Sequence, residues 1–84
     1  MEILWHKEAE KELKKIEKDI ARRIYKKVSL LATNPYLGEK LKGYTFPFYR
    51  LRVGNYRIIY LIEEKKIKIY RIGKREEIYK RIKE

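Results

Sequence analysis

The sequence predicts an α+β fold, in which a helical segment precedes a small sheet of about four strands and a short helix closes the chain. Two patterns carry this prediction. Apolar residues recur in steps of three and four along residues 7–33, which is typical of one buried helical face. Further along, two apolar runs flank the two-residue link Gly54-Asn55, which is a strong signal for an antiparallel hairpin.

The N-terminal half begins with a short strand at residues 3–5 and continues as the helical segment. Asp19 is suited to cap a second helix, so we expect a helical hairpin with a break near residues 17–19. Asn34-Pro35 ends the helical segment, because a residue before proline is pushed out of helical geometry. The apolar positions of the helical face are Ala9, Leu13, Ile16, Ile20, Ile24, Val28 and Leu31.

The C-terminal half reads as a loop, three strands and a helix. Residues 36–47 hold glycines and a proline and predict a loop, with a short strand at residues 41–42. Gly73 is expected to end the last strand. The other expected elements are strands at residues 48–53, 56–62 and 67–72, a turn at 63–66, and a helix at 75–83 with Ile78 and Ile82 facing inward.

Composition limits the class of protein. Eighty-four residues predict a single domain over residues 1–84. Twenty-three basic against 12 acidic residues give a net charge of +11, which predicts attraction to nucleic acid, an anionic membrane or an acidic protein. A heat-stable surface rich in Lys and Glu would explain the number of charges but not this excess of positive ones.

Several classes of site are excluded by the residue types present. The chain has no cysteine and a single histidine, His6, so we expect no disulfide, no metal and no cofactor. The apolar runs are too short to cross a bilayer, and the first residues do not resemble a signal peptide. The expected location is therefore the cytoplasm.

The register of the predicted hairpin separates two faces. A two-residue loop places Arg52 opposite Arg57 and Arg50 opposite Ile59, and directly opposed residues share a face. One face is apolar and is expected to receive the helices, whereas the other gathers Arg50, Arg52 and Arg57. The residues of the apolar face are Tyr49, Leu51, Val53, Tyr56, Ile58 and Tyr60.

The opposed pair Arg52 and Arg57 needs an explanation. Like charges directly opposite each other destabilise a sheet by up to ~1 kcal/mol. Either an anion binds there or a nearby carboxylate neutralises the pair. The acidic residues close in sequence are Glu63 and Glu64, which the hairpin places at its far turn, so we favour an anion site.

The sequence positions of three further residues predict where their side chains lie relative to the two faces. Arg71 would fall on the apolar face, so either a bulge intervenes or that end of the strand is exposed. Arg75 and Tyr79 are four residues apart, which would place them on one side of a helix that starts where the last strand ends. Arg75 would then reach the basic face.

Three segments together resemble the RelE/ParE superfamily of bacterial and archaeal toxins. They are residues 40–43 (Lys-Leu-Lys-Gly), the hairpin at residues 49–60, and residues 73–79. The resemblance implies a compact α+β fold, a twisted antiparallel sheet with two N-terminal helices packed on one face. It also implies a cognate acidic antitoxin of the RelB kind, whose segments would cover the basic face and displace the C-terminal helix. RelE-type members cleave messenger RNA in the ribosomal A site, whereas ParE-type members poison DNA gyrase.

By this resemblance the catalytic residues are Arg50, Arg52, Arg57, Arg75 and Tyr79. All five positions carry a basic or phenolic group, which favours a ribosome-dependent endoribonuclease over the ParE-like alternative. We assign Arg50 and Arg57 to the phosphate and Arg75 to the leaving group. Tyr79 would stack on a base or orient the 2′-hydroxyl.

This assignment names no residue as the general base. The best-known RelE pattern has lysines where this chain has Arg50 and Arg52, and many relatives carry a histidine where it has Lys74. Arginine, unlike lysine, stays protonated. Arg52 therefore only orients the hydroxyl, or the ribosome supplies what is missing, and we expect negligible cleavage of free RNA. A non-enzymatic RNA-binding module is a second alternative. Membrane binding is a weaker one, because no amphipathic helix rich in Trp and Phe supports it.

Overall fold

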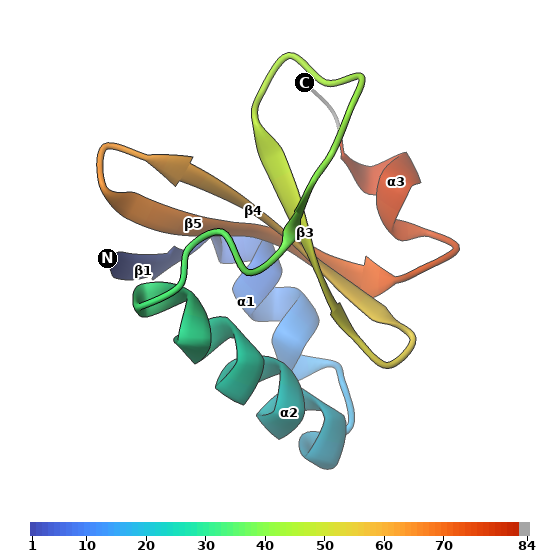
Figure 1. Ribbon diagram of the computed structural model, residues 1–84. Helices are drawn as coiled ribbons and strands as arrows, with labels where there is room; N and C mark the ends of the chain where they lie inside the picture. The colour runs from blue at the N-terminus through green and yellow to red at the C-terminus, as the bar shows by residue number, and fades with distance from the viewer. Residues whose placement is uncertain (83–84) are drawn as a thin grey trace.

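A computed structural model of the chain describes residues 1–82 and confirms the predicted α+β fold (Figure 1). Three α-helices and one 3-10 turn accompany a twisted sheet. The elements in chain order are β1 (Glu2–Trp5), α1 (Lys7–Lys14), α2 (Lys18–Ser29), the 3-10 turn η1 (Leu30–Ala32), β2 (Glu39–Lys40), β3 (Phe48–Val53), β4 (Tyr56–Glu63), β5 (Lys66–Lys74) and α3 (Ile78–Arg81).

The sheet differs from the expected antiparallel sheet of about four strands in two respects. Among the described residues it has five strands in the order β1-β5-β4-β3-β2, and β1 pairs with β5 in parallel. The parallel pairing arises because the chain leaves β1 through the helices and returns to β5 in the same direction. The short strand before the hairpin is Glu39–Lys40 and not residues 41–42. Every other pairing is antiparallel.

The hairpin of β3 and β4 has the predicted register, with Arg52 opposite Arg57 and Arg50 opposite Ile59. Gly54 opens its turn with φ of 56°, as a glycine at the first central position of a II′ turn does. The next turn, between β4 and β5, places Glu64 and Lys65 at φ of 48° and 64°. Positive φ at both central residues is typical of a I′ turn.

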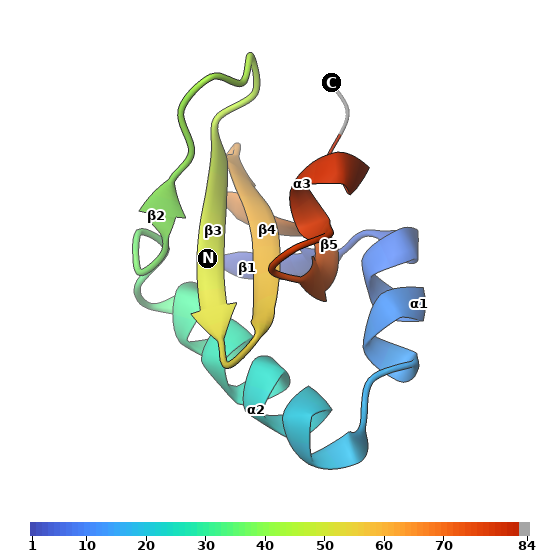
Figure 2. The same ribbon diagram turned by 90° about the vertical axis from the view of Figure 1, so that its right-hand side faces the viewer.

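Apolar residues cover both faces of the sheet, which makes β4 the central, buried strand. On one face, α1 and α2 pack over the hairpin and β5, as predicted. On the other face, Ile78 and Ile82 pack on Phe48, Ile59 and Leu61. Figure 2 shows α3 away from α2, alongside β4 and next to the end of β5. The basic residues therefore share their face with a second apolar cluster.

A bulge in β5 explains the position of Arg71. Ile59 pairs with Arg71 while Tyr60 pairs with Ile69, so Tyr70 is the extra residue. Because of the bulge, Ile72 follows Ile67 and Ile69 into the helix-covered core, and Arg71 leaves this alternation and pairs with Glu12 of α1. Of the two explanations offered by the sequence, the bulge is confirmed.

The predicted boundaries of the helices and of the last strand require three corrections. Glu17, not Asp19, is the N-cap of α2, and Asp19 lies in its first turn. Gly73 does not end β5, because β4 continues to pair with it through Lys74. Instead, Gly73 admits α3: a Cβ at this position would lie 3.1 Å from Ile78 Cδ1. The final helix accordingly begins at Ile78 and not at Arg75, and Lys83 lies outside the described residues.

Candidate functional site

Arg57 lies at the centre of the basic residues and is itself buried, with 6% of its surface exposed. Its Nη1 donates to the carbonyl oxygens of Gly54 at 3.0 Å and Tyr56 at 2.9 Å, which fixes the guanidinium beside the hairpin turn. Burial lowers the pKa of Arg57, and the positive charges of Arg52, Arg75 and Arg50 lower it further, whereas Tyr79 raises it. The other four predicted residues therefore all lie within electrostatic reach of Arg57.

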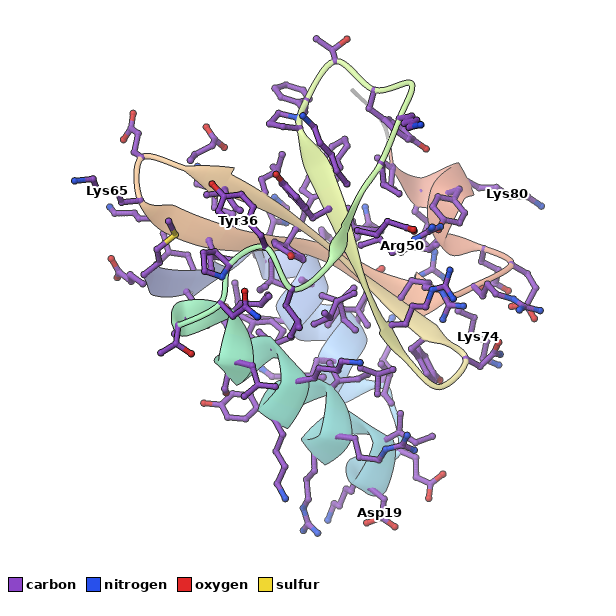
Figure 3. All side chains as sticks on the ribbon, in the orientation of Figure 1. Asp19, Tyr36, Arg50, Lys65, Lys74 and Lys80 are labelled. Carbon is purple, nitrogen blue, oxygen red and sulfur yellow. The ribbon has the colours of Figure 1, made fainter. Side chains whose placement is uncertain are left out.

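Arg50 connects β3 with α3. Figure 3 shows its side chain extending from β3 toward α3, where its Nη1 donates to the Tyr79 hydroxyl at 2.5 Å. The guanidinium carbon lies 6.0 Å from the centre of the Tyr79 ring, within the range of a cation–π contact. The site thus joins residues that are 29 positions apart in the sequence.

A carboxylate that the sequence reasoning did not consider pairs with Arg50. It belongs to Glu39, which β2 places directly opposite Arg50. Glu63, by contrast, pairs with Lys68 at 3.7 Å near the far turn. Glu39 is therefore a neutralising carboxylate beyond the two that were expected, and it acts on Arg50; within residues 1–82 the opposed Arg52 and Arg57 have no ion pair. Placing β2 at residues 39–40 would have revealed the pair, since its register with β3 follows from that placement.

The loop before β2 holds Glu39 in this position. The Tyr60 hydroxyl donates to the Pro35 carbonyl and accepts from the Gly38 amide, both at 2.9 Å. Burial raises the pKa of Tyr60, which keeps its phenol protonated and able to donate at neutral pH. Gly38 permits the close approach, because a Cβ there would lie 2.6 Å from the Arg50 carbonyl oxygen.

Arg75 enters the site from a turn and not from a helix, which corrects the predicted geometry. Its backbone amide donates to the Asn55 carbonyl at 2.9 Å, joining the end of β5 to the hairpin turn. Arg75 and Arg52 are both exposed. The site thus combines two exposed arginines, a buried one and an Arg50–Tyr79 pair.

No histidine lies in this cluster. The ring nitrogen Nδ1 of His6 accepts from the Glu8 amide at 3.1 Å and so caps α1, and its ring packs edge-on against Tyr70. Arg50 Nε is buried and has no acceptor within residues 1–82, so this guanidinium keeps an unused donor. In the same residues no group of three His, Asp or Glu side chains is arranged to hold a metal ion. The arrangement is suited to binding and stabilising a phosphate.

Fold and site together define a small basic α+β protein with a surface suited to an anion. A family model described as ParE toxin of type II toxin–antitoxin system, parDE, matches residues 3–79. The chain therefore belongs to the RelE/ParE superfamily of type II toxins. Comparison with curated protein sequences gives no match. None of the helices in residues 1–82 has the length and apolar character needed to span a membrane.

The chain is similar in sequence and structure to solved RelE toxins. It is 30% identical to the RelE of the archaeal RelE–RelB complex from Pyrococcus horikoshii OT3, with a TM-score of 0.77 over 88% of this chain and 93% of that one. It is also 30% identical to a chain of the RelB–RelE complex from Methanococcus jannaschii, with a TM-score of 0.77 over 95% of this chain and 99% of that one. The isolated E. coli RelE toxin, at 22% identity and a TM-score of 0.77, covers 95% of this chain and 92% of that one and shares the fold. Two of these relatives were solved with their antitoxins, which supports an antitoxin partner for this chain.

Proposed function

We propose that this toxin is a ribosome-dependent endoribonuclease that cleaves messenger RNA in the A site and so inhibits translation in the cytoplasm. The observation that carries the proposal is the convergence of Arg50, Arg52, Arg75 and Tyr79 around the buried Arg57. A surface that only needed to be soluble would spread these charges apart. The likeness to RelE structures supports the same activity.

In the proposed cleavage, the adjacent 2′-hydroxyl loses its proton and its oxygen attacks the scissile phosphorus. The bond to the 5′-oxygen breaks, a 2′,3′-cyclic phosphate forms, and the leaving oxygen receives a proton. Arg57 and Arg50 stabilise the charge on the pentavalent phosphate, because guanidinium groups bind its oxygens in pairs. Arg75 stands on the leaving-group side.

Arg52 and Tyr79 act on the nucleotide that is attacked. Arg52 is exposed beside Arg57 and orients the 2′-hydroxyl. Stacking of a base on the Tyr79 ring is worth about 1–3 kcal/mol. None of the five groups is a base at neutral pH, so free RNA is cleaved negligibly and the ribosome completes the site.

A ParE-like toxin that binds gyrase is the second candidate. One observation favours it: the family model that matches residues 3–79 is that of ParE toxins. In addition, Glu39 already occupies Arg50, which reduces the positive charge available to a phosphate. A non-enzymatic RNA-binding module is a third candidate, because stacking and phosphate contacts do not require cleavage.

The deciding experiment compares wild type with Arg57→Ala and Arg75→Ala on ribosomes programmed with message. Loss of one preorganised donor costs about 3 kcal/mol, so we expect cleavage to fall a hundredfold or more while ribosome binding is nearly retained. Because Arg57 is buried, its replacement also affects folding. Arg57→Lys, which keeps the positive charge, and thermal melting of each variant separate the loss of the donor from the loss of the fold. Lys65→Ala, at the far turn, is the control (Figure 3).

Each candidate predicts a different outcome. A wild type that inhibits gyrase supercoiling and leaves message intact is a ParE-like toxin. If Arg75→Ala weakens RNA binding, and wild type does not cleave, the protein is a binding module. Equal toxicity of wild type and both variants on expression contradicts the nuclease.

A further inference from the structure

Two basic hollows adjoin the site on the side of α2. The first has a volume of about 220 Å³ and is lined in part by Lys27, Glu39, Arg50 and Arg52. The second, of about 370 Å³, is lined in part by Arg23, Lys26, Lys27 and Arg52. Lys27 and Arg52 line both hollows, and the Lys27 Nζ donates to the Arg52 carbonyl oxygen at 2.9 Å. The hollows therefore meet at Arg52, next to the Arg57 that it opposes.

The positive charges of α2 lie on two flanks of the helix. Arg23 and Lys27, four residues apart, line the hollow beside β3, whereas Lys18 and Arg22 line a groove beside α1. Arg22 has a carboxylate partner, Asp19, at 3.9 Å, whereas Lys18 and Lys26, which line the same groove, have none within residues 1–82. Within residues 1–82 neither Arg23 nor Lys27 lies at ion-pair distance from a carboxylate. Figure 3 shows Asp19 at the end of α2 remote from Arg50.

This distribution is unfavourable for the isolated protein. Like charges four residues apart on a helix repel each other, and the cationic Arg52 adds to the repulsion. Lys27 is half-buried and anchored to the end of β3, so its charge is held close to Arg52 instead of moving into solvent. A bound anion would relieve the repulsion. What sets this flank apart is the bond that ties Lys27 to β3, since Lys18 on the other flank also has no ion pair within residues 1–82.

We propose that Arg23, Lys27 and Arg52 form a second phosphate subsite, which binds a neighbouring phosphodiester of the RNA strand whose scissile phosphate lies at Arg57. The inference rests on RNA as the substrate of the proposed function. Arg52 links the two subsites. The added subsite follows the backbone and reads no base, as basic grooves for single-stranded RNA do. It fixes the direction in which the strand leaves the scissile phosphate, past β3 toward α2.

The test measures RNA affinity against KCl concentration for two matched double variants. Arg23→Gln/Lys27→Gln removes the subsite, and Lys18→Gln/Arg22→Gln removes the same charge from the other flank. The probe is a fluorescein-labelled 2′-O-methyl oligouridylate of about eight nucleotides, which cannot be cleaved at a 2′-hydroxyl. Each phosphate contact contributes about 0.7 to the slope of log K on log salt for single strands.

We expect the slope to decrease by about 1.4 for Arg23→Gln/Lys27→Gln, by about 0.7 for Arg23→Gln alone, and little for Lys18→Gln/Arg22→Gln. Arg23→Gln leaves the contact between Lys27 and Arg52 intact and so separates the loss of charge from the loss of packing. A 2′-O-methyl dinucleotide, whose one phosphate reaches only Arg57, should not distinguish the two double variants. Thermal melting confirms that each variant is folded.

Equal slopes for the two double variants would overturn the subsite, as would an equal effect on the dinucleotide. Weakened binding of the cognate antitoxin with an unchanged RNA slope would also overturn it, because the surface would then serve a protein. A wild type that cleaves no message on ribosomes but shows the expected slope difference refutes the nuclease and supports the subsite. Failure of the proposed function is thereby separable from failure of the inference.

Discussion

Arg50 is the residue at which the protein's own interactions compete most directly with a substrate. In the structure it binds Glu39 and Tyr79 at once, while its Nε is buried with no acceptor among residues 1–82. To contact a phosphate with both terminal nitrogens, its guanidinium must release Glu39. For the proposed function, the carboxylate therefore opposes RNA binding, both by occupying Arg50 and by repelling the phosphate.

Replacing Glu39 with Gln should tighten RNA binding. The Glu39 side chain is 61% exposed, and an exposed ion pair is worth about 0.2–1 kcal/mol, so we expect affinity for non-cleavable RNA to rise up to about fivefold at low salt. Thermal stability should change little. Glu64→Gln, at the far turn, is the control for net charge. Weaker binding by Glu39→Gln would mean that Glu39 holds Arg50 in its RNA-binding orientation.

At the scale of elements, one carboxylate joins α1, β5 and α3. Glu12 accepts from the Arg71 Nη2 at 3.1 Å, the Arg81 Nη1 at 2.8 Å and the Ile72 amide at 2.9 Å. The amide lies on the part of β5 beyond the end of its pairing with β1. Glu12 thus satisfies an open strand edge and holds α3, and with it Tyr79, against the rest of the protein.

Glu12→Ala should destabilise the protein by about 2–3 kcal/mol, because it leaves the partly buried Arg71 and the Ile72 amide without their acceptor and removes one of the two carboxylates that bind the exposed Arg81. That loss lowers Tm by roughly 10–20 °C for a domain of this size. Glu8→Ala is the control: it removes an exposed carboxylate of the same helix whose pair with Lys11 spans 3.9 Å. A melting temperature no lower for Glu12→Ala than for Glu8→Ala would refute this role.

The elements that the sequence predicted well are those with local signals. The hairpin register followed from the Gly54-Asn55 turn, and with it the opposition of Arg52 and Arg57. The pairing of β1 with β5 and the partner of Arg50 depend on contacts across many residues, which no local pattern encodes. Arg75 and Tyr79 were expected on one helix because spacing cannot show that β4 extends β5 past Gly73. Their convergence on Arg57 came from the resemblance and from the fold, not from spacing.

At the scale of the whole molecule, the site depends on a short C-terminal helix. The four residues of α3 are far too few to be stable as an isolated helix, so packing and side-chain bonds hold it in place. Those contacts are the burial of Ile78 and Ile82, the pair between Arg81 and Glu12, and the bond from Arg50 to Tyr79. A partner that replaced them would remove Tyr79 from the site.

An acidic antitoxin can make that replacement. The net charge of +11 attracts it, its carboxylates can take over the arginines, and its apolar residues can occupy the positions of Ile78 and Ile82 on Phe48, Ile59 and Leu61. Burying each isoleucine contributes about 1.5–3 kcal/mol, and an antitoxin segment with matching apolar residues recovers it. We therefore predict that the cognate antitoxin inactivates the toxin by displacing α3 and covering the arginines.

Hydrogen exchange of the toxin, alone and bound to the antitoxin, measures this directly. On binding, the amides of residues 78–82 should lose protection, while those of β3 and β4 should gain it. Glu12→Gln weakens the contact with Arg81 and should therefore raise amide exchange at residues 78–82 in the free toxin. The further loss of protection when the antitoxin binds should then be smaller than in wild type. Increased protection of residues 78–82 in the complex would show that the antitoxin covers α3 in place and blocks the site without dismantling it.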